Sequence, residues 1–345
     1  MTDHSTRDNR RQLEDIGLPL SIAENMIENV IGLMHYPIGK ANGLIVNGRE
    51  RVVLLATEQK HTVKLVSKGA ALTRGTGGFY AASSAPWMIG QIQIMNVIDF
   101  DTVRERILSE KEEILRIANT LSRRRKALDV SVRQIDSAVG HMTIVEVIVD
   151  VGDSMGANIV NSMCEAVSPL IESLSGGEMK IRSLSNLATN RMVNVKTRVT
   201  PDALGGKNIV DDIRRACAFA DADPYRAATH NKGIMNGVVG VLMATCNDIR
   251  AVEAGAHAYA AKDGPYKPLS TWNDNDEGDL VGELSMPMAV GVVGGAISAH
   301  PTAKRCVEIM GVESATDLGE VAASVGLAYN LAVLRMLVTD GILSV

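Results

Sequence analysis

The sequence predicts an α/β (α+β) protein in which a large mixed domain is interrupted by a smaller inserted one. Its 345 residues favour about two domains. Between about residues 99 and 192, helices and alternating strands follow a β-α-β-like order, while the segments on either side have a different character. We therefore expect residues 1–98 and 193–345 to form the large domain and residues 99–192 to form the small one.

The first part of the large domain is expected to contain two helices and a hairpin. Apolar residues recur at helical spacing in residues 21–35, which predicts an amphipathic helix ending at Gly32. Two β-rich runs in residues 44–56 flank an Asn-Gly pair at positions 47 and 48, which is typical of a tight hairpin turn. Residues 58–73 follow as a second helix, and a glycine-rich segment then separates it from a strand at 89–97.

The inserted segment and the second part of the large domain continue this alternation. Residues 100–127 have the pattern of one charged helix. The elements expected after it within the insertion are two alternating strands, a helix and a strand, at residues 129–135, 142–150, 154–174 and 179–183. The second part of the large domain is expected to hold a strand at 192–200, a helix at 208–220 and long Gly/Ala-rich helices to the end.

Composition argues against several classes of protein. The 35 basic and 40 acidic side chains give a net charge of −5, so we expect no nucleic-acid partner. No run of 18 apolar residues occurs and residues 1–17 lack an apolar signal core, so we expect a cytoplasmic protein without a membrane span. Four scattered cysteines lack CxxC spacing and seven histidines form no HExxH, so neither a disulfide framework nor a metal site is expected.

One candidate ligand site lies at residues 153–161, where an apolar strand is followed by a glycine-containing turn and a helix. The free N–H groups in the first turn of such a helix suit a pyrophosphate or a carboxylate. Asp153 or Ser154 would equally serve as a plain helix cap, and the spacing is not that of GxGxxG. Nucleotide binding and simple capping both stay open on the residues alone.

A second candidate site surrounds Lys232, which lies among polar and small residues in a mostly apolar segment. A lysine in such surroundings can stabilise an oxyanion, and the alternative is a surface lysine with its stem packed on apolar neighbours. Asp248 follows the apolar residues 238–246 and suits either an ion pair with Lys232 or the cap of the next helix. His257 on an Ala-rich helix is expected to be a core histidine.

Taken together, these segments resemble one family, the class II 3-hydroxy-3-methylglutaryl-CoA reductases. The matching segments run in order across nearly the whole chain: ENVIG at 28–32, GGF at 77–79, SSAP at 83–86, DSMGAN at 153–158, LSNL at 184–187, DPYRAATHNKGIMNG at 223–237, MPM at 286–288, GGA at 294–296 and HP at 300–301. Their number and order make the resemblance highly specific for homology.

The resemblance implies reduction of an acyl-CoA or acyl-carrier thioester to an alcohol with two equivalents of NAD(P)H, as in the conversion of 3-hydroxy-3-methylglutaryl-CoA to mevalonate. It also implies an inserted ferredoxin-like dinucleotide-binding domain and a homodimer with a shared active site. Lys232 would stabilise the oxyanion and Asp248 would orient it. The resemblance further implies substrate binding by Arg226, Asn236 and Asn186, and cofactor binding by Asp129, Asp153, Met155, Gly156 and Asn158.

The chain departs from the family pattern at three places. Gln59 falls where the family has a catalytic glutamate, with Glu58 one residue too early, and an amide cannot act as a proton acid. The sequence stops at residues 340–345, before the flap that carries the family's thiolate-protonating histidine, so we expect impaired thioester reduction. Four basic residues at 123–126 replace a glycine-rich turn, which favours NADPH or marks a degraded pocket.

Two other functions fit the same residues. A chain that keeps Lys232 and Asp248 without the flap suits reduction of an aldehyde, a ketone or a bulky carrier-bound acyl group. A non-redox relative would instead use the acyl or CoA pocket for binding, or for acid/base chemistry such as cyclisation or dehydration. Binding of a nicotinamide cofactor distinguishes the redox functions from the non-redox one.

Overall fold

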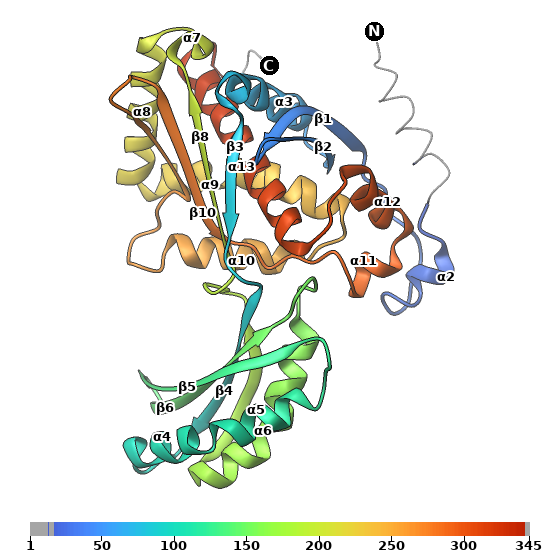
Figure 1. The fold of residues 1–345 in the computed structure, drawn as a ribbon, viewed down its shortest axis with the longest axis vertical. Coiled ribbons are helices and arrows are strands. Elements are labelled where there is room, and N and C mark those ends of the chain that lie inside the picture. The colour runs from blue at the N-terminus through green and yellow to red at the C-terminus, as the bar shows by residue number, and fades with distance from the viewer. Residues whose placement is uncertain (1–12, 14–16, 342–345) are drawn as a thin grey trace. The chain divides into compact units, whose positions relative to one another are not determined.

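The computed structural model describes residue 13 and residues 17–341 (Figure 1). The chain forms two compact units, one built from Met1–Ser83 with Met192–Val345 and the other from Ser84–Arg191. The expectations about the leader and about the chain end concern residues 1–12, 14–16 and 342–345, which lie outside the described residues. The mixed α/β class predicted from the sequence is confirmed.

The first unit is built on a mixed six-stranded sheet, in the order β2-β1-β3-β8-β10-β9. The predicted hairpin is confirmed, because its turn places Asn47 and Gly48 at φ of 50° and 75°, which Asn and Gly tolerate best. The strands are β1 (Ile38–Val46), β2 (Arg49–Ala56), β3 (Phe79–Ser83), β8 (Met192–Val199), β9 (Ser270–Asp274) and β10 (Leu280–Pro287).

Helices complete the first unit, and the longest of them, α13 (Ala315–Val338), packs against α3 (Thr62–Thr73) and α9 (Pro224–Ala244) (Figure 1). Helix α13 is long and apolar enough to cross a membrane, yet 78% of its most apolar window is buried within the unit, as in a core helix. The other helical elements are α2 (Leu20–Ala23), η1 (Arg74–Thr76), α7 (Pro201–Leu204), α8 (Lys207–Ala222), α10 (Ile249–Ala260), α11 (Gly295–Ala299) and α12 (Pro301–Met310).

Close contact between α3 and α13 depends on Gly69. A Cβ atom at this position would lie 1.9 Å from the carbonyl oxygen of Ala328 on α13. We expect Gly69→Ala to lower the free energy of unfolding by about 3 kcal/mol, because backbone rather than a flexible side chain must move. Urea denaturation measures the effect. Gly233→Ala on α9 is the matched control, since its Cβ meets nothing within 4 Å, and it should stabilise by about 0.5–1 kcal/mol.

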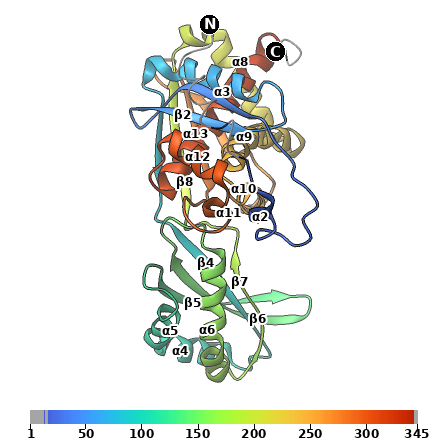
Figure 2. The ribbon, with the colours of Figure 1, turned by 90° about the vertical axis from the view of Figure 1, so that its right-hand side faces the viewer.

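The second unit is an antiparallel four-stranded sheet in the order β5-β6-β4-β7, with α6 packed on β4 and β7 and with α5 beside α6 (Figure 2). Strand, helices, two strands, helix and strand follow one another as in a ferredoxin-like fold. The elements are β4 (Trp87–Met95), α4 (Phe100–Ser109), α5 (Lys111–Asn119), β5 (Lys126–Ser137), β6 (Gly140–Asp150), α6 (Ala157–Ser175) and β7 (Glu178–Ser185).

Several expected elements differ from the structure. The second unit begins at Ser84 rather than near residue 99, because β4 pairs with β6 and β7 and so belongs to the inserted sheet. The single helix expected at 100–127 is two helices that end at Asn119, followed by β5. Only Leu20–Ala23 of the expected 21–35 helix is helical, and Asn29 has a positive φ of 52° that interrupts helical geometry. Strands β3, β9 and β10 were not predicted.

Candidate active site

Helix α9 begins at Pro224, and the carboxylate of Asp223 accepts a hydrogen bond from Tyr225 N at 3.0 Å as its N-terminal cap. Two glycines let α9 approach its neighbours closely. A Cβ at Gly237 would lie 2.9 Å from the carbonyl oxygen of Val325 on α13, and one at Gly240 would lie 2.8 Å from Leu55 on β2. The glycines of the HNKGIMNGVVG segment therefore place α9 directly against the end of β2.

Two buried residues just before Lys232 fix the rotation of α9. Asn231 donates from Nδ2 to the carbonyl oxygen of Lys267 at 2.9 Å and accepts from Leu269 N at 2.8 Å. His230 Nε2 lies 2.7 Å from Ser270 Oγ, in a buried network that includes Asn330.

Burial, reinforced by the positive charge of Arg226, lowers the pKa of His230 to about 4, so its ring is neutral at physiological pH. With His230 and Asn231 bonded to the core, the next residue, Lys232, is exposed.

Lys232 is brought together with Gln59, which lies in the loop between β2 and α3. Lys232 Nζ donates to Gln59 Oε1 at 3.2 Å, and Gln59 N donates to Thr57 Oγ1 at 3.0 Å. Both side chains, together with Glu58 and Asn236, line a cavity of about 120 Å³ between this loop, α9 and α10. Asn236 Nδ2 also donates to the Tyr329 hydroxyl at 3.0 Å. A cation and two amides thus face one small space.

Asp248 caps α10 in this structure, the second of the two roles expected for it. Its Oδ1 accepts from Ala251 N at 3.1 Å and lies 3.7 Å from an Arg250 nitrogen. The turn before it is held by Asn247, which donates to Gly291 O at 3.1 Å and accepts from Gly291 N at 2.8 Å. Within residues 17–341, no ion pair of 4.0 Å or less joins Asp248 to Lys232, so their pairing stays a prediction.

The three residues expected to bind substrate are distributed over both units. Arg226 and Asn236 lie on α9, and Arg226 forms no ion pair within the described part of the chain. Asn186 is an exposed residue of the second unit, in the loop after β7. The structure therefore brings Asn236 to the cavity that Lys232 lines and places Asn186 in the other unit.

The expected cofactor turn lies in the second unit, where Gly156 precedes helix α6. No side chain caps this helix and no acidic residue lies in its first turn, which leaves N–H groups available to an anion. Gly156 has a φ of 98°, and a Cβ there would lie 2.4 Å from Val151 Cγ1, so the turn requires glycine. Asp153 and Asn158 are exposed on either side of the turn. This geometry fits the diphosphate of a dinucleotide.

Two arginines form hydrogen bonds to the turn that precedes α6. Buried Arg191 donates to the carbonyl oxygens of Ser154 and Met155 at 3.0 and 3.2 Å, and Arg125 Nε donates to Ser154 Oγ at 3.0 Å. Burial lowers the pKa of Arg191 to about 10, with Asp153 and Asp150 opposing the shift, so its guanidinium stays charged at neutral pH. These contacts fix the backbone of the turn just before the uncapped start of α6.

Asp129 is exposed near the start of β5, in an ion pair with Lys111 of α5. The hydrogen bond from Lys111 and the one from Val130 N hold the pKa of Asp129 below its usual range. Arg123 and Arg124, in the segment that leads into β5, are also exposed. The carboxylate that the resemblance assigns to the adenine ribose is therefore already paired with one lysine.

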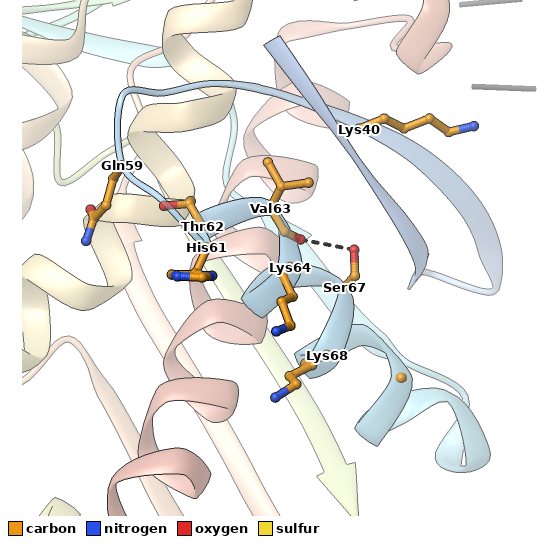
Figure 3. A pocket seen from close by; sticks show the side chains of 9 residues that line it. Lys40, Gln59, His61, Thr62, Val63, Lys64, Ser67 and Lys68 are labelled. Atoms are coloured by element: carbon orange, nitrogen blue, oxygen red, sulfur yellow. Dashed lines mark hydrogen bonds between the residues drawn. The ribbon is translucent and has the colours of Figure 1, made fainter. Parts of the chain in front are cut away.

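A second cavity, of about 690 Å³, lies along α3 and was not predicted from the sequence (Figure 3). Lys64 and Lys68 project to the same side of the helix, and neither forms an ion pair among residues 13 and 17–341. Gln59 lines this cavity as well as the smaller one beside Lys232. The sequence signal was the i, i+4 spacing of two lysines without nearby acidic partners.

Glu253 is a further residue of the small cavity to which the sequence analysis gave no role. It lies on α10 and faces the same space as Lys232 and Gln59. Its Oε2 is 3.2 Å from Nε2 of His257, and His257 Nδ1 is 2.7 Å from the Tyr266 hydroxyl. His257, expected in the core, is half-exposed instead.

Comparison with known proteins gives one consistent family. The sequence model described as hydroxymethylglutaryl-coenzyme A reductase matches residues 1–344. The 3-hydroxy-3-methylglutaryl-coenzyme A reductase of Archaeoglobus fulgidus is 46% identical over 94% of this chain and 76% of its own length. A probable reductase of the same name from Borreliella burgdorferi is 34% identical over 92% of this chain and 74% of its own.

Solved structures agree with the sequence comparisons. The class II 3-hydroxy-3-methylglutaryl-CoA reductase of Streptococcus pneumoniae, bound to NADPH in open conformations, is similar with a TM-score of 0.93 and 38% identity. The likeness covers 96% of this chain and 93% of that one.

Proposed function

Because the chain belongs to the hydroxymethylglutaryl-coenzyme A reductase family, we propose that it reduces the thioester of 3-hydroxy-3-methylglutaryl-CoA, or of a close acyl analogue, in the cavity beside Lys232. The chain is an NAD(P)H-dependent oxidoreductase of this family, and the family uses an acyl-CoA substrate. The contact that carries the proposal is the hydrogen bond from Lys232 Nζ to Gln59 Oε1 in the wall of that cavity.

The groups around this contact suit a carbonyl that becomes an oxyanion. Lys232 brings a positive charge and Asn236 an amide donor to a space of about 120 Å³, where a thioester oxygen would lie close to both. Gln59 holds the ammonium group in place from the opposite wall. Arg226, free of ion pairs in the described chain, is the residue we assign to the acyl carboxylate.

The second unit is proposed to bind the nicotinamide cofactor, which supplies a hydride for each of the two reductions. The uncapped start of α6 and the Gly156 turn would hold its diphosphate. Lys111, which pairs with Asp129, and the exposed Arg123 and Arg124 in the segment that leads into β5 favour the 2′-phosphate of NADPH over the free ribose of NADH.

The basic cavity on α3 is proposed to bind the phosphates of coenzyme A. Lys64 and Lys68 supply two cations on one helix face (Figure 3). Gln59 lines both this cavity and the one beside Lys232. A thioester is separated from the diphosphate of coenzyme A by a long flexible arm, so two adjoining cavities of unequal size suit its two ends.

We also propose a cytoplasmic homodimer. Ile27, Ile31 and Met34 lie in the segment after α2, and their side chains are largely exposed to solvent. Neighbouring exposed apolar side chains of this kind mark protein contacts more often than free surface. The ENVIG segment, which carries part of the family resemblance, includes Ile31 and lies in this same stretch.

The test is turnover of 3-hydroxy-3-methylglutaryl-CoA by the purified chain, with NADPH or NADH consumption followed by absorbance and oligomer mass measured in the same preparation. We expect two NADPH per alcohol formed and a lower KM for NADPH than for NADH. Lys68→Ala should raise the KM for the CoA ester about tenfold, since a phosphate contact typically contributes about 1.5 kcal/mol. Its effect on the KM for mevaldehyde, which carries no coenzyme A, should be negligible.

Two results would contradict this assignment. Saturable binding of the CoA ester without any binding of NADPH or NADH would favour a non-redox relative. Equal KM changes for the CoA ester and for mevaldehyde in Lys68→Ala would remove the phosphate role of the α3 cavity. Lys180→Ala in the second unit, where Lys180 pairs only with Glu178 in an exposed contact, is the charge-matched control.

A further inference from the structure

Reduction of a carbonyl to an alcohol requires a proton at the oxygen, and the cavity beside Lys232 holds two carboxyl groups that can carry one. These are Glu58, from the loop after β2, and Glu253, from α10. The amides of Gln59 and Asn236 donate hydrogen bonds but do not release protons at accessible pH. Among these four the proton source is one of the two carboxyl groups, and the Lys232 ammonium beside them is assigned to charge stabilisation rather than to proton release.

Glu253 is the carboxyl group with a proton relay behind it. Its Oε2 lies 3.2 Å from His257 Nε2, one helical turn further along α10, and His257 Nδ1 lies 2.7 Å from the Tyr266 hydroxyl. Burial raises the pKa of Tyr266, so its hydroxyl keeps its proton at neutral pH and donates it to Nδ1. With Tyr266 donating to Nδ1, the Nε2 atom of His257 carries a hydrogen directed at Glu253.

Water can return a proton to this hydrogen-bonded network. The His257 side chain is 39% exposed and the Glu253 side chain 35%, so the histidine contacts water while the carboxylate reaches the cavity. Glu58 lacks such a connection, because within the described residues its side chain forms neither a hydrogen bond nor an ion pair. The charged and titratable groups that face Glu253 are His257 on its own helix, Tyr266, Lys232 on α9 and Glu58.

We propose that Glu253 is a catalytic residue that protonates the carbonyl oxygen and that His257 positions it and restores its proton; the proposal rests on the reductase function above. In each reduction the carbonyl carbon gains the hydride that NAD(P)H loses, and the π pair of the C=O bond becomes a lone pair on oxygen. That oxygen takes the proton from the Glu253 carboxyl group, next to the stabilising charge of Lys232. Glu253 then takes the Nε2 proton of His257 while His257 Nδ1 takes the hydroxyl proton of Tyr266, and the Tyr266 oxygen regains a proton from water.

The test is Glu253→Gln, which keeps the shape of the side chain and its acceptor for His257. We expect kcat for mevaldehyde and for 3-hydroxy-3-methylglutaryl-CoA to fall about 10²–10³-fold, the range typical of a general acid. Dissociation constants for NADPH and the CoA ester, measured by fluorescence and calorimetry, should stay unchanged. The loss should appear in kcat rather than in the KM for either substrate, because a general acid acts on the reacting oxygen and not on ground-state binding.

His257→Leu separates a relay from a purely structural histidine. Loss of the relay lowers kcat and leaves both dissociation constants unchanged, whereas a structural role also weakens binding of NADPH or the CoA ester. Glu308→Gln on α12 is the matched control for removal of a helix carboxylate, because Glu308 pairs only with Arg305 in an exposed contact.

Three outcomes would overturn the assignment. If Glu58→Gln removes activity while Glu253→Gln does not, Glu58 is the donor. If the wild-type chain is inactive and Gln59→Glu is active, the cavity lacks a donor until one is introduced. If the wild-type chain and Gln59→Glu both bind NADPH and the CoA ester but neither reduces a substrate, the reductase function itself is wrong. Glu253 then has no such role.

Discussion

Replacing Lys232 by methionine lowers kcat for 3-hydroxy-3-methylglutaryl-CoA reduction by about 10²–10³-fold, the loss expected when one preorganised oxyanion donor is removed. The methionine keeps the length of the stem and its packing on α9, so the change removes the charge and the hydrogen bond to Gln59. The effect should appear in kcat more than in the dissociation constant of the CoA ester, because the oxygen becomes negative only as the reaction proceeds. Stopped-flow measurement of a single turnover separates the two quantities.

Two further variants make the lysine result specific. Lys232→Arg keeps the charge and should recover only part of the rate, because a planar guanidinium does not place a donor where the ammonium group was. Lys207→Met removes an exposed lysine at the start of α8, which lines neither of the cavities described above, and should leave kcat unchanged. Loss of CoA-ester binding rather than of kcat in Lys232→Met would instead make Lys232 a binding residue.

The sequence was informative wherever local chemistry decides the structure. The Asn-Gly turn at residues 47 and 48 requires positive φ, which few residues other than Asn and Gly adopt readily, so the hairpin could be placed closely. The glycines of α9 likewise carried information, because Gly237 and Gly240 allow the contacts that place Lys232 near the end of β2. These are short-range or single-residue requirements that one sequence displays directly.

Elements decided by tertiary contacts could not be predicted in the same way. Ile27 and Ile31 have helical spacing, but both are largely exposed among the described residues, and α2 ends at Ala23. Strand β4 was assigned to the wrong unit, because the residues of one strand do not indicate which sheet it joins. Pairing with β6 and β7 decides that β4 belongs to the second unit.

The candidate site shows the same limit. Lys232 was singled out from its surroundings, whereas the role of Glu253 emerges only from its place across the cavity, twenty-one positions further along the chain. Asp248 illustrates the converse case, because the helix cap, the local one of the two roles expected for it, is the role that the structure shows. Sequence reasoning thus found side chains with unusual neighbours and missed those whose neighbours come from other elements.

Gly156→Ala weakens NADPH binding by about 10²-fold. The added Cβ would lie 2.4 Å from Val151 Cγ1, and the φ of 98° disfavours any side chain, so the turn before α6 must move. A shift of this turn would move the N–H groups that we expect to bind the diphosphate. The loss of one or two charge-assisted hydrogen bonds lowers the binding free energy of NADPH by about 3 kcal/mol. Nicotinamide fluorescence measures the dissociation constant directly.

The control for this change is at the other end of the same helix. Gly176→Ala also introduces a side chain at positive φ, 62°, but its Cβ meets nothing within 4 Å and it lies at the C-terminus of α6, away from any phosphate. It should lower the free energy of unfolding by about 1 kcal/mol and leave NADPH affinity intact. Because coenzyme A is assigned to the first unit, CoA-ester affinity should be unaffected in both variants. Unchanged NADPH affinity in Gly156→Ala would mean that the diphosphate lies elsewhere, whereas a parallel loss of CoA-ester affinity would trace the defect to folding.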